Sequence, residues 1–75
     1  MIVRQKKFGN GKLVEINYIE PYYYVELRED AKGWNMPWEV REDGTRHIMS
    51  DITKDIYEAQ SVYDEYTRKA RENGY

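Results

Sequence analysis

Residues 12–29 read KLVEINYIEPYYYVELRE, two stretches of alternating apolar and polar side chains on either side of one proline. A pleated strand sends successive side chains to opposite faces, so the apolar members of each stretch share one face. These members are Val14, Ile16, Tyr18, Tyr23, Val25 and Leu27. Proline cannot donate to a strand ladder, and Pro21 separates the two stretches. The pattern predicts two strands, at residues 12–20 and 22–29.

Further strands are predicted on both sides of this pair. Residues 2–8 form a first strand, followed by Gly9-Asn10-Gly11, which tolerates the positive φ of a tight hairpin. Downstream, residues 38–41 are expected as a fourth strand with Trp38 and Val40 inward. Asp43-Gly44 is a strong hairpin signal, and residues 45–49 would return as a fifth strand.

A long helix is predicted at the carboxy-terminal end of the chain. Its apolar stripe, at spacings of three and four, consists of Ile52, Ile56, Ala59, Tyr63, Tyr66 and Ala70. Ser50 or Asp51 is expected to cap its start, and Gly74 falls where a carboxy-terminal cap would lie. The fold class is therefore α+β: an antiparallel sheet of four to five strands, then one long helix packed on one sheet face.

Length and composition predict one small intracellular domain spanning residues 1–75. A chain of this size has a modest stability, on the order of 5 kcal/mol. It contains no cysteine, which suits a reducing cytoplasm, and no apolar run long enough to span a membrane. The net charge of −2 divides unevenly, because residues 1–12 carry four basic residues and no acid. The excess of acid elsewhere argues against a general polyanion binder.

Catalysis and cofactor binding have little support in the sequence. The one histidine, His47, falls on a predicted strand, and with Asp51 it would supply only two metal ligands. Glycine-rich phosphate loops need a following helix, which Gly9-Asn10-Gly11 lacks. We expect a protein that is not an enzyme and that holds no cofactor or metal.

Binding has better support, from aromatic side chains expected outside the core. If Tyr23 points inward, Tyr22 and Tyr24 lie side by side on the other sheet face. Tyrosine, tryptophan and methionine are favoured contact residues in interfaces. We expect Tyr22 and Tyr24 as anchors and a charged rim that sets orientation; the alternative is that these tyrosines and Trp34 only cover the small core. With the loop residues that extend the contact, the predicted partner-binding set is Tyr22, Tyr24, Glu26, Arg28, Lys32, Trp34, Met36 and Arg41.

The predicted function is stoichiometric binding to a macromolecule, with a protein as the favoured partner. Small domains without catalytic motifs include inhibitors and regulators, among them the host-interaction proteins of phages and mobile elements. The alternative is a nucleic-acid-binding module that stacks bases on the same tyrosines. Glu15, Glu20, Glu26 and Glu29 on the same strands disfavour it. A homodimer formed through the open sheet face would bury the same tyrosines.

Overall fold

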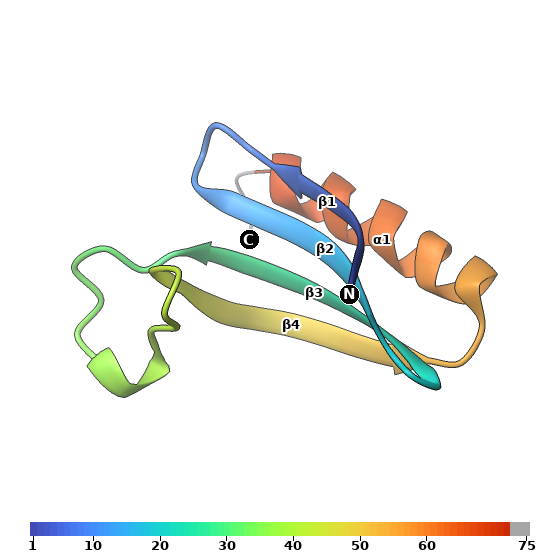
Figure 1. Cartoon of the computed structure of the whole chain (residues 1–75). Helices are drawn as coiled ribbons and strands as arrows, with labels where there is room; N and C mark the ends of the chain where they lie inside the picture. Colours follow the sequence, from blue (N-terminus) through green and yellow to red (C-terminus); the bar gives the residue numbers. More distant parts are fainter. Residues whose placement is uncertain (73–75) are drawn as a thin grey trace.

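The computed structural model describes residues 1–72 as a four-stranded antiparallel sheet followed by one helix (Figure 1). The strands pair in chain order, β1 next to β2, β2 next to β3, and β3 next to β4. Their bounds are Ile2–Lys7 for β1, Lys12–Ile19 for β2, Tyr22–Asp30 for β3 and Thr45–Thr53 for β4. The helix, α1, spans Ile56–Arg71 and lies against one side of the sheet. The predicted fold class is confirmed.

The core lies between α1 and the two central strands, as the alternation predicts. The register places Val14 opposite Leu27, and Ile16 opposite Val25. All four side chains point toward the helix, and we call this side of the sheet the helix face. They pack against Ala59, Tyr63, Tyr66 and Ala70, the buried stripe of α1. The sheet side away from α1 is called the open face.

The β1–β2 turn depends on a glycine and on an asparagine that reaches the helix. Gly11 has φ +85°, and an added Cβ would come within 3.2 Å of the Cβ of Asp30. Glycine is therefore the residue that fits this turn. The Asn10 side-chain amide donates to the carbonyl oxygen of Ala70, at 2.7 Å. This bond joins the first hairpin to the last turn of α1.

Two predicted boundaries are wrong: the start of the helix and the end of the strand before it. The helix starts later than expected: Asp55 is its cap, accepting from the Tyr57 N–H, and residues 50–53 belong to β4. They stay extended because they pair with the first residues of β3, from Tyr23↔Thr53 to Glu26↔Ser50. Ile52 is therefore a strand residue outside the helical stripe. The predicted cap at Gly74 lies outside the described residues.

The expected fourth strand at residues 38–41 is also wrong. Pro37–Glu39 forms one turn of 3-10 helix, and a single bridge, Val40↔Arg46, touches the sheet. Proline at the start of the segment suits a helical turn and removes a strand donor. Trp38 points out rather than inward, with 78% of its surface exposed. The return strand predicted at residues 45–49 is the longer β4.

Candidate binding surface

The open face has a charged end, in which Glu15, Glu26 and Arg28 are buried, and an apolar end, whose side chains are exposed apart from the half-buried Tyr24. Rows of side chains cross this face from β1 to β4, as the strand register shows. One row runs Gln5, Glu15, Glu26, Ser50, and the next contains Ile2, Asn17, Tyr24 and Ile52. The rows toward the β3–β4 loop are charged, and the rows toward the β2–β3 turn are apolar.

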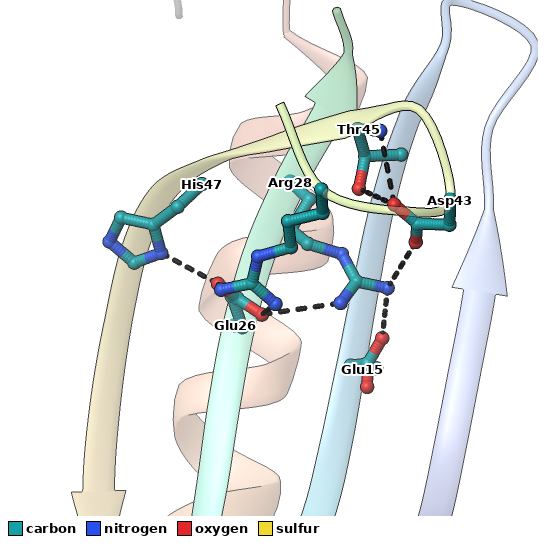
Figure 2. Close-up of polar contacts among 7 residues, drawn as sticks. Glu15, Glu26, Arg28, Asp43, Thr45 and His47 are labelled. Atoms are coloured by element: carbon teal, nitrogen blue, oxygen red, sulfur yellow. Dashed lines mark hydrogen bonds and ion pairs between the residues drawn. The ribbon is translucent and has the colours of Figure 1, made fainter. Parts of the chain in front are cut away.

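The charged end is a cluster of six side chains, which we call the Glu26 cluster. Its members are Glu15, Glu26, Arg28, Arg41, Asp43 and His47. Glu26 is only 1% exposed and is the centre of the cluster. Its carboxylate accepts from both terminal nitrogens of Arg41, and its Oε2 lies 2.7 Å from Nδ1 of His47. Figure 2 shows the cluster on the open face, with α1 behind the sheet.

Arg28 links the two central strands to the loop that follows β3. Its Nη2 lies 2.5 Å from Oε1 of Glu15 and 3.3 Å from Oδ2 of Asp43, while its Nη1 lies 3.4 Å from Oε1 of Glu26. Glu15 and Glu26 sit directly opposite each other in the ladder, where two unpaired carboxylates would repel. The guanidinium groups compensate this repulsion, since a buried charge needs a partner.

The predicted charged rim is therefore wrong for Glu26 and Arg28. Both lie on the open face, as expected, but both are buried and paired with each other. The loop between β3 and β4, residues 31–44, folds back so that Arg41 and Asp43 reach them. Sequence alternation identifies the face of each residue, but it carries no signal for this loop contact.

Thr45 fastens one end of the same loop, and it provides a pH-dependent contact. Its hydroxyl and its backbone N–H both donate to Oδ1 of Asp43, at 2.5 and 3.0 Å. The hydroxyl bond is the main reason that the pKa of Asp43 lies below its ordinary value of 3.8. Partial burial opposes this shift, and the charges of Arg28 and Arg41 add to it.

Acid is expected to release this contact only at low pH. A lowered folded-state pKa contributes stability that is present above the unfolded pKa and is lost as pH falls through the folded value. The Thr45 amide resonance should therefore stay constant from neutral pH to about 3.8 and move only below it. Thr45→Val, which removes the hydroxyl, should shift this midpoint upward. An unchanged midpoint in the variant would contradict the assignment.

The apolar end contains five side chains, which we call the tyrosine end. They are Ile2, Ile19, Tyr22, Tyr24 and Ile52. Ile19 and Ile52 are 59% and 57% exposed, and Tyr22 is 40% exposed. The Lys54 ammonium lies 5.4 Å from the centre of the Tyr22 ring. The sequence identified the two tyrosines, but it missed Ile52, because that residue matched the stripe of the predicted helix.

Of the two tryptophans of the loop, Trp34 is engaged within the domain, which is one of its two expected roles, whereas Trp38, expected inward, is exposed. Trp34 is half-buried: the Arg46 guanidinium lies 3.9 Å above its ring, and its Nε1 donates to Oε1 of Glu39 at 2.9 Å. Its side chain is thus engaged within the domain, and Met36 is half-buried. Trp38 is the exposed indole, and Lys32 is also exposed.

The structure does not bring the loop and the tyrosines together. Tyr22 begins β3 and Asp30 ends it, and the loop follows from that far end. The nine residues of β3 are separated by eight steps of about 3.3 Å, which place the two ends about 26 Å apart. The single contact surface expected from Tyr22 to Met36 is therefore two separate surfaces.

Residues 1–72 also bear on metal binding and on membrane insertion. In this part of the chain, no three histidine, aspartate or glutamate side chains are grouped to hold a metal ion. No helix within it has the length and apolar character needed to cross a membrane. His47 and Asp51 lie on opposite sheet faces, since they pair with Arg28 and Val25. Comparisons with family models, curated proteins and solved structures found no match.

Proposed function

We propose that this chain is a small non-enzymatic binding protein that acts stoichiometrically, as an inhibitor or regulator, on a protein partner. The tyrosine end of the open face is the contact surface. One observation carries the proposal: aliphatic and aromatic side chains from all four strands stand together on the sheet side that α1 leaves uncovered. Exposed apolar patches of this kind are typical of interaction sites.

The surroundings of the patch also support a protein contact. The adjacent Glu26 cluster is internally paired, so a partner would meet few unpaired charges beside the apolar side chains. Tyr22 and Tyr24 provide large, rigid contact area with a polar tip, as anchors in interfaces do. Their backbone is held in β3, between two neighbouring strands, which lowers the entropic cost of binding.

The placement of the basic residues weakens the nucleic-acid alternative. Arg4 and Lys6 lie on the helix face, where the Arg4 guanidinium stacks 4.6 Å from the centre of the Tyr63 ring. On the open face, Arg28 and Arg41 are already paired with carboxylates. Tyrosines that stack bases need free cations beside them to hold the phosphates. Among the described residues, Lys54 is the one cation that contacts a tyrosine ring of this surface.

Loss of the two tyrosines is expected to abolish partner capture. The Tyr22→Ala, Tyr24→Ala double variant and the wild type would be compared as baits in nuclease-treated lysate of the source cells. Truncating true anchors costs more than about 2 kcal/mol of binding, or about 30-fold in Kd, which calorimetry with the purified partner would measure.

Tyr57→Ala is the matched control for this experiment. Tyr57 is the most exposed of the described tyrosines, and it lies on α1 rather than on the sheet. Partner affinity should be unchanged in this variant. Equal affinity of the wild type and the double variant would contradict the proposed surface. Recovery of only nuclease-sensitive material would favour the nucleic-acid alternative.

A further inference from the structure

The outer edge of the sheet at β1 has no neighbouring strand among the described residues, and the pairing of β1 with β2 is regular from Arg4 to Lys7, with a register shift between Ile2 and Arg4. All six residues of β1 are exposed, and the strand pairs on one side only, with β2. The opposite edge, at β4, is partly covered, because Val40 bridges Arg46 and the Arg41 N–H donates to the carbonyl oxygen of Thr45. An open edge presents unpaired N–H and C=O groups that can pair with another extended chain.

The hairpin geometry identifies which N–H groups of β1 point outward. The Phe8 N–H donates to the Lys12 carbonyl oxygen at 2.9 Å, so it points toward β2. In an antiparallel pair this direction alternates from residue to residue. The N–H groups of Lys7 and Gln5 therefore point away from the sheet, to the side where an added strand would lie.

The charge along this edge is positive on both faces of the sheet. Arg4 and Lys6 lie on the helix face, and Lys7 lies on the open face, opposite Leu13. Residues 1–12 contain no acid, whereas the whole chain has a net charge of −2. Neither Arg4, Lys6 nor Lys7 is in an ion pair with the described residues. Arg4 and Lys6 lie over the rings of Tyr63 and Phe8, contacts that leave their charges unneutralised and able to attract an acidic ligand.

We propose that β1 takes up an extended acidic segment of a protein partner as a fifth strand of the sheet. Backbone pairing along the outer edge supplies binding, and the charges of Arg4, Lys6 and Lys7 select carboxylate side chains. The same charges repel the β1 edge of a second copy, because two such edges would place cations against cations. This inference deepens the proposed function, on which it rests, by naming the chemical class of the partner.

Backbone geometry favours a peptide over a nucleic acid at this edge. A phosphate backbone would be attracted by the same cations, but it cannot form a strand ladder with the outward amides. Ile2 of the same strand belongs to the tyrosine end of the open face, so this edge borders the proposed contact surface. A strand added beside β1 would therefore extend the proposed contact surface.

The test uses a defined probe, the acetylated and amidated peptide Glu-Val-Glu-Val-Glu-Val-Glu, and NMR of the labelled chain. Shifts should be confined to β1 and β2, and the amides of Gln5 and Lys7 should gain protection against hydrogen exchange. Two versions of the peptide, N-methylated at the odd or at the even positions, keep the charge. In one of them the methyl groups replace the N–H groups that pair with β1, so its affinity should be at least tenfold lower. Raising the salt concentration should also weaken binding.

Charge reversal separates the edge from other basic positions. The Lys6→Glu, Lys7→Glu variant should lose at least tenfold in affinity, whereas Lys32→Glu, an exposed lysine of the β3–β4 loop, should bind like the wild type. The Tyr22→Ala, Tyr24→Ala variant should also bind the peptide normally, so failure of the tyrosine surface and failure of the edge can be told apart. A wild-type spectrum confirms that each variant is folded.

Three outcomes would overturn the inference. The first is the absence of any shift at millimolar peptide. The second is equal affinity for both N-methylated peptides, with no added protection at Gln5 and Lys7. The third is tighter binding of an oligothymidylate than of the peptide, which would identify the edge as a polyanion site.

Discussion

Glu26→Ala is expected to lower the free energy of unfolding by about 3–5 kcal/mol, the cost of breaking a buried charge pair by removing one partner. The carboxylate is almost fully buried and contacts two arginines and one histidine. Without it, Arg28 keeps Glu15 but loses its contact within β3, and Arg41 loses the carboxylate that holds the loop. Urea unfolding monitored by far-ultraviolet circular dichroism would measure the change.

Two further variants serve as comparisons for Glu26→Ala. Glu26→Gln keeps the shape and one accepting oxygen, so it should lower the free energy of unfolding by less than Glu26→Ala does. Glu42→Ala removes an exposed acid of the same loop and should change stability by less than about 0.5 kcal/mol. If Glu26→Ala were no more costly than Glu42→Ala, the Glu26 cluster would not be what closes the loop onto the sheet.

Leu27→Ala is expected to cost about 2–5 kcal/mol, the range for a buried leucine that leaves a cavity. Leu27 is fully buried, lies opposite Val14 and Met49, and belongs to the core packed against α1. In a domain whose total stability is on the order of 5 kcal/mol, this loss would leave a large unfolded fraction at 37 °C. The thermal midpoint and the urea midpoint should both fall.

Ile52→Ala is the matched control on the other side of the sheet. It also shortens a large aliphatic side chain on a strand, but its side chain is exposed on the open face. Its cost should stay below about 1 kcal/mol, since little apolar surface is buried there. Equal costs for the two variants would show that the open face carries part of the core. The same Ile52→Ala variant should weaken partner binding if the tyrosine end is the contact surface.

The loop of residues 31–44 shows why local sequence signals were insufficient for the candidate surface. Trp34 and Trp38 are chemically identical and four residues apart, so the sequence offers no rule for which of them is covered. The structure covers Trp34 because Arg46 of β4 and Glu39 are both in reach of its ring. Arg46 is in turn held by Glu29 of β3, at 2.5 Å. The two Arg46 contacts depend on the pairing of β3 with β4, which are distant in the sequence, whereas the Glu39 contact is local to the loop.

The sequence by itself determined the faces of the elements. Alternation between residues 12 and 29 placed Val14, Ile16, Val25 and Leu27 on one side and both outer tyrosines on the other, because a strand has a side-chain period of two. The spacing of the buried residues of α1 followed in the same way from the helical period. These features are local, and no distant contact was needed to specify them.

Tertiary structure decided where the last strand ends, and which charges are buried. Residues 50–53 carry capping signals, but pairing with β3 keeps them extended, and the cap moves to Asp55. Glu26 and Arg28 resemble surface residues in the sequence, yet the returning loop buries and pairs them. In both places, long-range hydrogen bonds and ion pairs outweigh local preferences of a few tenths of a kcal/mol to about 1 kcal/mol.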